Sequence, residues 1–342
     1  MEKISAGLYQ SAEYVEVGKI EKPTIETGEA RVKVKYAGIC GTDMMIFSGK
    51  HPRATAPLAM GHEFSGVIDD MQGSSAFSTG DRVVIEPTLS CGTCEACQNG
   101  NNHVCKELQL IGIDKHGGFA EYVKVPVDRL HPIPEKLPDT MAALTEPVAV
   151  AVHTVRRSDV NVGQTVAVLG AGPIGLLTGI IAKLAGAKEV IISDVSPYRL
   201  DKAEEMGLTP VDARHKDIKE EVMDRTMDKG ADVVFEVAGN SVTAKQMVDL
   251  AKIQGQIVVV SVYKQPPEVN LAAMHFKEIS LTTTRCYSHD DFKTAIAIMA
   301  DELDLSGLIS HVLPLDDIEK GFSLMKNPDN ALKILIQPER EE

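Results

Sequence analysis

The sequence predicts an α/β protein of two domains, one built on a doubly wound parallel sheet and the other mainly of β structure. Three observations support this fold class. The chain has 342 residues, more than one hydrophobic core usually organises. Strand-like and helix-like segments alternate regularly from about residue 164, whereas residues 1–150 hold short strand-like segments between Gly and Pro. Hydrophobic residues make up 44% and charged residues 25%, which is typical of a globular protein.

The strand-like segments of the first 150 residues are short and irregularly spaced. They read ARVKVKYAGI, SGVIDDM, DRVVIEP and FAEYVKVP, and they lie at residues 30–39, 65–71, 81–87 and 119–126. Turn residues separate them. This pattern predicts a largely antiparallel β domain.

The middle of the chain alternates between buried strands and helices. The first strand, TVAVLG, leads into a helix that begins at Pro173 and ends at Gly186. Further strands are expected at 189–194, 231–239 and 256–262, and further helices at 197–207, 216–230 and 241–255. Because parallel strands need helical crossovers, this order predicts a doubly wound sheet over residues 151–285. A helix at 290–302 and a strand at 331–338 follow.

A glycine-rich turn follows the first of these strands. Gly170, Gly172 and Gly175 form G-x-G-x-x-G, and Pro173 and Ile174 open the helix. The first glycine permits a tight turn, the second lets the backbone approach a pyrophosphate, and the third lets the helix pack close to the strand. The helix N-terminus favours phosphate charge. The motif predicts a Rossmann-type dinucleotide site, and a purely structural turn is the alternative for a lone match.

Asp194 ends the second strand, nineteen positions after Gly175. A carboxylate there accepts hydrogen bonds from the adenosine ribose hydroxyls and repels a 2′-phosphate, so the sequence predicts NAD rather than NADP. Arg199 counts against this preference, because a nearby Arg can accommodate the phosphate. A helix N-cap is the alternative role for Asp194.

Four of the six cysteines lie within fifteen residues. Cys91, Cys94, Cys97 and Cys105 have the spacing C-x2-C-x2-C-x7-C on a loop rich in Gly and Asn. Four thiolates can close a tetrahedron around Zn²⁺ and leave no open position, so this lobe, at about residues 88–108, is predicted to bind a structural zinc. Free thiols are the alternative. The N-terminus shows no secretory signal, so we expect a cytoplasmic protein without disulfides.

Charge and hydropathy argue against two classes of partner. The formal net charge of −14 repels nucleic-acid phosphates and anionic lipid. The uncharged stretch 160–182 is long enough to cross a bilayer. It contains polar residues, glycines and Pro173, however, so a buried strand, turn and helix are expected instead. We therefore expect neither a nucleic-acid nor a membrane partner.

A second set of residues suited to zinc is dispersed along the chain. GICGTD contains Cys40 and Thr42, MGHEFSG contains His62 and Glu63, and TEP contains Glu146. One thiolate, one imidazole and one carboxylate suit Zn²⁺ and leave a fourth position open. Taken singly, each residue is equally explained by burial or an ordinary hydrogen bond, and composition alone does not join them.

These motifs, in order, resemble the zinc-containing medium-chain alcohol dehydrogenase family over nearly the whole chain. The similarity runs through GICGTD, GHEFSG, GDRV, the four-cysteine lobe, GGFAEY, TEP and VLGAGPIGLL, and is greatest to the sorbitol, threonine and butanediol dehydrogenase branch. It implies a GroES-like catalytic domain from residues 1–150 and 286–342 around a Rossmann domain at 151–285. The implied enzyme is an NAD-dependent homodimer or homotetramer that interconverts a small secondary alcohol and its ketone.

The resemblance also implies roles for the dispersed residues. Cys40, His62 and Glu63 would hold a catalytic zinc, and Glu146 would be either a ligand or hydrogen-bonded to the zinc-bound water. Thr42 would take the proton of the alcohol. Two zinc ions per chain, one catalytic and one structural, are therefore expected.

Two neighbouring positions refine this picture. Asp43 would accept a hydrogen bond from the ring of His62. Relatives often carry a His three positions after the motif Thr, whereas this chain has Met45, so the proton must leave by another route. The remaining histidines are expected to be surface or loop residues.

Two rival functions are weighed against this one. A zinc-free, NADPH-dependent quinone or enone reductase on the same scaffold is opposed by Asp194, Cys40 and His62. A non-catalytic zinc-binding module that contacts nucleic acid is opposed by the net charge of −14.

Overall fold

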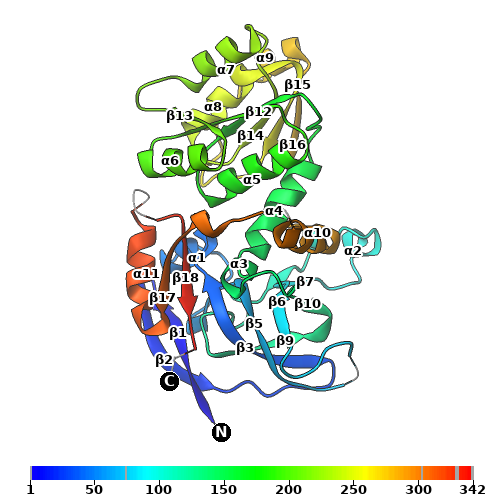
Figure 1. Cartoon of the computed structure of the whole chain (residues 1–342), viewed down its shortest axis with the longest axis vertical. Coiled ribbons are helices and arrows are strands. Elements are labelled where there is room, and N and C mark those ends of the chain that lie inside the picture. The colour runs from blue at the N-terminus through cyan, green and yellow to red at the C-terminus, as the bar shows by residue number, and fades with distance from the viewer. Residues whose placement is uncertain (1, 74, 302, 328–330, 340–342) are drawn as a thin grey trace. The chain divides into compact units, whose positions relative to one another are not determined.

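The computed structural model describes residues 2–73, 75–301, 303–327 and 331–339, and divides into two compact units (Figure 1). Unit 1 comprises Met1–Glu146 and Ser288–Glu342, and unit 2 comprises Pro147–Tyr287. The predicted ranges also include residues 1, 74, 302, 328–330 and 340–342, which lie outside the described residues.

Unit 1 is organised around a seven-stranded sheet of mainly antiparallel strands, with the order β10-β6-β5-β3-β18-β17 and β9 paired with β3. Its strands are β3 (Glu29–Gly38), β5 (Glu63–Met71), β6 (Arg82–Ile85), β9 (Tyr122–Pro126), β10 (Leu130–Pro132), β17 (Ile309–Pro314) and β18 (Lys333–Gln337). Because β18 pairs antiparallel with β3, the C-terminal segment completes the sheet of the N-terminal one.

Smaller elements surround this sheet. Strands β1 (Lys3–Ser11), β2 (Tyr14–Glu21) and β4 (Leu58–Ala59) form a second sheet, and β7 (Thr88–Leu89) pairs with β8 (Gln109–Leu110). The helices are α1 (Gly41–Phe47), α2 (Glu95–Gln98), α3 (Asp139–Ala142), α10 (His289–Asp301) and α11 (Ile318–Met325), and α4 (Thr145–Arg156) begins at the end of this unit's first segment.

Unit 2 is a six-stranded, wholly parallel sheet with the order β13-β12-β11-β14-β15-β16. The strands are β11 (Thr165–Leu169), β12 (Glu189–Asp194), β13 (Thr209–Asp212), β14 (Ala231–Glu236), β15 (Ala251–Val259) and β16 (Ser280–Thr283). The crossovers carry α5 (Pro173–Leu184), α6 (Pro197–Glu205), α7 (Ile218–Thr226), α8 (Ser241–Leu250) and α9 (Leu271–Lys277). The strand order reverses at β11, so the predicted doubly wound sheet is confirmed.

One predicted helix is too long. The sequence predicts a helix over 241–255, whereas α8 ends at Leu250 and β15 begins at Ala251, opposite Ala231. The ammonium group of Lys277 donates to the carbonyl groups of Val248, Asp249 and Ala251, which supplies partners that a helix end otherwise lacks. This tertiary contact overrides local helix propensity.

The uncharged stretch 160–182 forms β11, the glycine turn and most of α5, as predicted. Among the helices of the described residues, none combines the length and the apolar character needed to cross a membrane.

Candidate metal and cofactor sites

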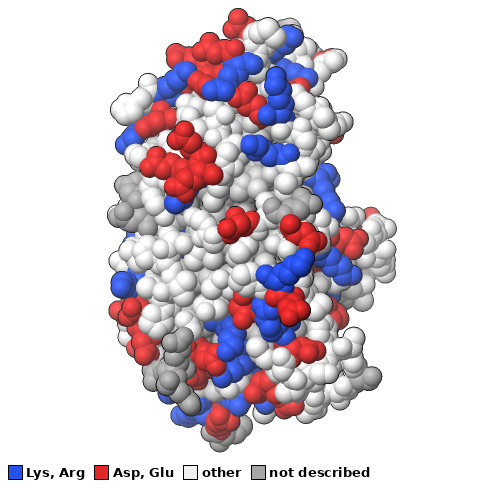
Figure 2. Space-filling view, in the orientation of Figure 1, with Lys and Arg blue, Asp and Glu red and all other residues white. Residues whose placement is uncertain are grey.

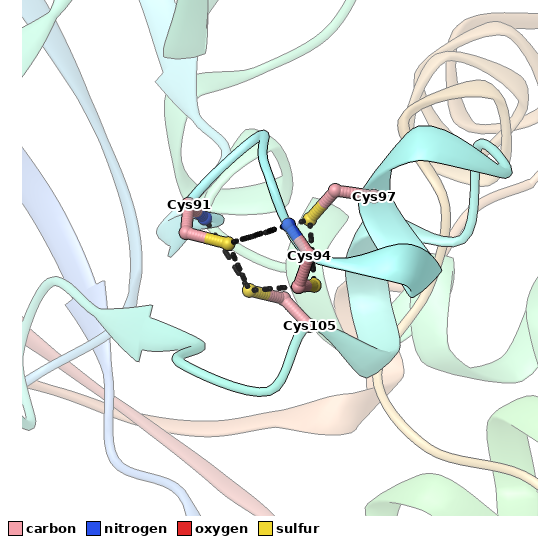
Figure 3. Close-up of side chains that lie close together, drawn as sticks. All are labelled: Cys91, Cys94, Cys97 and Cys105. Carbon is pink, nitrogen blue, oxygen red and sulfur yellow. Dashed lines mark hydrogen bonds between the residues drawn. The ribbon is translucent and has the colours of Figure 1, made fainter.

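The four clustered cysteines lie on the loop between β7 and β8, and their sulfur atoms point toward one another (Figure 3). The Sγ–Sγ distances are 3.5 Å for Cys94–Cys97 and Cys91–Cys105, 3.9 Å for Cys94–Cys105 and 4.0 Å for Cys91–Cys97. A tetrahedron with Zn–S bonds of about 2.3 Å has edges of about 3.8 Å. These distances match that edge and exclude disulfide bonds among the pairs.

The lobe already supplies partners for negatively charged sulfur. The amide of Cys94 donates to Cys91 Sγ at 3.4 Å, and the amide of Glu107 donates to Cys105 Sγ at 3.3 Å. Hydrogen bonds from Thr93 lower the pKa of Cys91 to about 6. Partial burial and the neighbouring Cys94 sulfur raise the pKa of Cys97 to about 12. A cation among the four sulfurs would stabilise all of them as thiolates.

The dispersed residues Cys40, His62 and Glu63 also converge, in unit 1. Cys40 follows β3 and precedes α1, His62 lies between β4 and β5, and Glu63 begins β5. One ligand atom from each residue lies within 4.8 Å of the others. The backbone amide of Cys40 donates to Asp43 Oδ2 at 2.8 Å, which fixes the turn that carries the thiol. Three such ligands suit Zn²⁺ and leave one position open.

Asp43 lies against the imidazole of His62, at the place expected for an outer partner. Its Oδ1 atom is 3.6 Å from His62 Nδ1 and accepts a hydrogen bond from the Gly61 amide at 3.3 Å. Burial acts to lower the pKa of His62, but the charges of Asp43 and Cys40 outweigh it and raise the pKa well above its ordinary value. The negative charges that favour a proton on His62 would equally favour a metal cation, to which the imidazole binds in its neutral form.

Glu146, Thr42 and Met45 lie in the same unit as these ligands. Glu146 is the second residue of α4 and is buried, but it is not among the side chains that converge within 4.8 Å. Thr42 and Met45 lie on α1 and are half-buried. The side chain of Met45 offers no strong hydrogen-bond acceptor for a proton arriving from Thr42.

The glycine turn of unit 2 has the geometry that the motif predicts. Gly170 has φ +109°, which is unfavourable for other residues. A Cβ atom on Gly175 would lie 1.8 Å from the Gly170 carbonyl oxygen, so only glycine lets α5 pack this close. At Gly172 the nearest atom to such a Cβ is Arg199 Nη1, at 3.9 Å, which leaves the backbone open to a ligand. Pro173 and Ile174 begin α5.

Asp194 lies at the end of β12, beside this turn. Its Oδ2 atom accepts from the Ala171 amide at 2.8 Å, and its Oδ1 atom accepts from the Val195 and Ser196 amides at 2.8 and 3.0 Å. Arg199 Nη1 is 3.7 Å from Asp194 Oδ2. The N-cap of α6 is Ser196, not Asp194, so the capping alternative for Asp194 is wrong.

Comparisons with known proteins agree with these sites. Residues 26–135 match the alcohol dehydrogenase GroES-like domain, and residues 173–301 match the zinc-binding dehydrogenase family. The chain is 38% identical to 2-dehydro-3-deoxy-L-galactonate 5-dehydrogenase of Pseudoalteromonas atlantica, over 93% of this chain and 94% of that protein. It is 36% identical to sorbitol dehydrogenase of Halalkalibacterium halodurans, with the same coverage of both chains.

A solved structure extends the likeness to three dimensions. The 2R,3R-butanediol dehydrogenase of Bacillus subtilis superposes with a TM-score of 0.92 at 33% identity, covering 98% of this chain and 100% of that one. The chain belongs to the zinc-binding alcohol dehydrogenase family. The predicted enzyme class, oxidoreductase acting on CH–OH groups, and the GroES-like plus Rossmann fold are thereby confirmed.

Sequence reasoning missed one residue of the candidate metal site around Cys40, His62 and Glu63. Lys333, the first residue of β18, is 3% exposed, and its ammonium group donates to both carboxylate oxygens of Glu63. A single Lys within the apolar segment ALKILI was the available signal, because a charged residue in a buried strand needs a partner.

It also missed a hydrogen-bonded cluster in unit 1. Glu86 Oε2 accepts from His131 Nε2 at 3.0 Å and from His289 Nδ1 at 2.6 Å, and Oε1 accepts from Arg129 at 3.0 Å. His131 is buried, and so is His153 within α4, so the expectation of a surface or loop position is wrong for both. Burial opposes ionisation of Glu86, but the two imidazoles and Arg129 outweigh it and lower its pKa to about 2.

On the face of the molecule in Figure 2, acidic and basic side chains of the described residues are interspersed.

Proposed function

We propose that this dehydrogenase oxidises a small secondary alcohol to its ketone with NAD⁺, at a zinc ion held by Cys40, His62 and Glu63 with Glu146 beside them. The observation that carries the proposal is the convergence within 4.8 Å of a thiol from one segment with an imidazole and a carboxylate from another. The named relatives act on a sugar acid, a polyol and a diol, which supports substrates that carry a hydroxyl on a secondary carbon.

The chain's own residues supply binding, orientation and a proton acceptor. Zinc supplies Lewis acidity, which lowers the pKa of an alcohol hydroxyl and so favours hydride loss from the adjacent carbon. Asp43 orients the imidazole of His62, and the Asp43 contact with the Cys40 amide holds the thiol in place. In this proposal the hydroxyl of Thr42 takes the alcohol proton. Because Met45 cannot pass it on, the proton leaves through water, the cofactor ribose or Glu146.

In the proposal, the four-cysteine lobe has a structural role rather than a catalytic one. Four sulfur ligands leave no position for substrate, so Cys91, Cys94, Cys97 and Cys105 hold a second zinc that stabilises the loop. Each chain therefore carries two zinc ions with separate roles.

NAD⁺ is the proposed cofactor of unit 2. The glycine turn at Gly170, Gly172 and Gly175 offers backbone to the pyrophosphate, and Asp194 offers a carboxylate to the adenosine ribose. The negative charge of Asp194 would repel a 2′-phosphate, which favours NAD⁺ over NADP⁺, whereas Arg199, with Nη1 3.7 Å from Asp194 Oδ2, offsets part of that charge. Assembly as a homodimer or homotetramer, and a cytoplasmic location, stay predictions.

The experiment is a spectrophotometric assay of NADH formation with polyols, sugar acids, diols and threonine, each with NAD⁺ and NADP⁺, before and after chelator treatment. The proposal expects chelator-sensitive reduction of NAD⁺ with one of these substrate groups. Cys286→Ala serves as a control, because Cys286 lies outside both cysteine-containing groups and its loss should leave two zinc ions bound. Turnover that is indifferent to metal removal and requires NADPH would contradict the proposal.

A further inference from the structure

Lys333 is a buried ammonium group whose partners belong to the proposed metal site. Its Nζ atom is 2.8 Å from Glu63 Oε1, 2.6 Å from Glu63 Oε2 and 3.4 Å from the carbonyl oxygen of Ile39. Both side chains are almost fully buried, with 4% and 1% of their surface exposed. Burying either charge without the other would be strongly unfavourable. The pair is therefore a fixed feature of this site.

The backbone beneath the pair is shaped to hold it. Gly38, the last residue of β3, pairs with Glu63 in β5 and with Leu335 in β18. A Cβ atom on Gly38 would lie 2.3 Å from Glu63 Oε2 and 3.3 Å from Lys333 Cδ. Glycine at this position therefore provides the space in which Glu63 and Lys333 meet.

The charges around Lys333 explain why a cation is useful there. Cys40, Glu63 and Glu146 all act on Lys333 electrostatically. If all three are ionised, the two charges of a zinc ion and the one charge of Lys333 offset these three negative charges, and Asp43 beside His62 adds a fourth. Without the ammonium group, the centre would carry one further uncompensated negative charge, and Glu63 would be free to bind the metal with its full charge.

We propose that Lys333 is a positioning residue of the metal site. It holds Glu63 by both oxygens and offsets its charge, so that Glu63 binds the metal only weakly and one coordination position stays open for the alcohol. This inference rests on the proposed function, because it takes Cys40 and His62 as metal ligands.

The test is the variant Lys333→Met, in the full-length chain without substrate. Zinc affinity is measured by competition with a chromophoric chelator, and the difference from Cys40→Ala assigns the signal to this site rather than to the four-cysteine lobe. We expect the Met variant to hold this zinc at least about 10-fold more tightly, because a nearby positive charge is lost. The visible spectrum of the Co²⁺-substituted protein should shift toward a higher coordination number. The KM for the alcohol should rise.

A general weakening of the fold would give the opposite result, a loss of metal affinity. Lys333→Arg, which keeps the charge, should retain the wild-type zinc affinity. In a Glu63→Gln background, Lys333→Met should change zinc affinity by less than about twofold, because the carboxylate through which Lys333 acts is gone. Unchanged or weaker zinc binding in folded Lys333→Met overturns the inference.

A second variant keeps the inference testable if Lys333→Met fails to fold. Gly38→Ala retains both charges but closes the space for Glu63 Oε2, and it should shift zinc affinity and the Co²⁺ spectrum in the same direction as Lys333→Met. Unchanged or weaker zinc binding in Gly38→Ala overturns the inference in that case.

The outcomes separate the inference from the function on which it rests. If Cys40→Ala loses one zinc ion but the wild-type protein oxidises no alcohol, the proposed function fails and the metal-site inference stands. If Cys40→Ala keeps both zinc ions, both fail. If alcohol oxidation requires Cys40 but Lys333→Met binds zinc as the wild type does, only the inference fails.

Discussion

The two groups of candidate metal ligands in unit 1 differ in how the chain builds them. The four-cysteine lobe takes all its ligands from one loop and one residue type, with sulfur atoms 3.5–4.0 Å apart. The group of Cys40, His62 and Glu63 draws on two segments and three residue types, and its outer partner Lys333 lies 270 residues from Glu63. The first arrangement would fill every coordination position of a zinc ion, as structural sites do, whereas the second would leave one position open for a substrate, as catalytic sites do.

Removing one ligand of the closed group tests the structural half of this comparison and should have the largest effect in free energy. Cys97→Ala leaves three sulfurs around the ion, and structural Zn²⁺ contributes on the order of 10 kcal/mol to small domains that depend on it. We expect loss of one zinc ion, a lower melting temperature and proteolysis within the lobe. Metal analysis and calorimetry check this result, and a variant as stable as the wild type with two zinc ions would break the comparison.

Removing one ligand of the open group tests the catalytic half. Cys40→Ala should lower kcat/KM at least about 1,000-fold, because the metal supplies several kcal/mol of stabilisation to the developing charge. The melting temperature should stay within a few degrees of the wild type, since the seven-stranded sheet does not depend on the thiol. Retained turnover would exclude Cys40 as a ligand of the working metal.

The cluster around Glu86 sharpens the comparison, because it joins two imidazoles and a carboxylate without being assigned a metal. The lowered pKa of Glu86 means that its contribution to stability is present above about pH 4.5 and is lost as the pH falls toward 2. Glu86→Gln should destabilise the protein by about 3 kcal/mol at neutral pH. Denaturant titrations between pH 3 and pH 7 measure the free energy of unfolding of the variant and the wild type. An equal difference between the two proteins at both ends of that range would contradict the prediction.

The smallest expected effect concerns unit 2, to which the account assigns cofactor specificity rather than metal ligands. Asp194→Asn keeps the shape of the side chain but removes the negative charge beside the glycine turn. The preference for NAD⁺ over NADP⁺, as a ratio of kcat/KM values, should fall about 10-fold, the equivalent of one charge-assisted hydrogen bond. An unchanged ratio would mean that Asp194 does not discriminate between NAD⁺ and NADP⁺ at the adenosine ribose.

Local patterns explain what the sequence could predict. The cysteine lobe and the glycine turn are contiguous, and each residue type has a geometric reason visible within a few positions, such as the left-handed φ of Gly170. Cys40 could be assigned to the same site as His62 and Glu63 only through the family resemblance, because the two segments share no sequence pattern that predicts their contact.

Contacts between distant segments explain what was missed. His289 meets Glu86 across 203 positions, and Lys333 meets Glu63 through the pairing of β18 with β3. The end of α8 was misplaced for the same reason, since Lys277 satisfies the carbonyl groups there from 26 to 29 positions away.

Stepwise removal of zinc, with activity and metal content followed together, tests the central claim most directly. An open site exchanges its metal faster than a closed four-sulfur site. The first zinc ion removed should therefore abolish alcohol oxidation, while the second stays in the lobe and the protein remains folded. Re-addition of one equivalent of zinc should restore activity. Full activity in a protein that retains zinc only in the four-cysteine lobe would contradict the account.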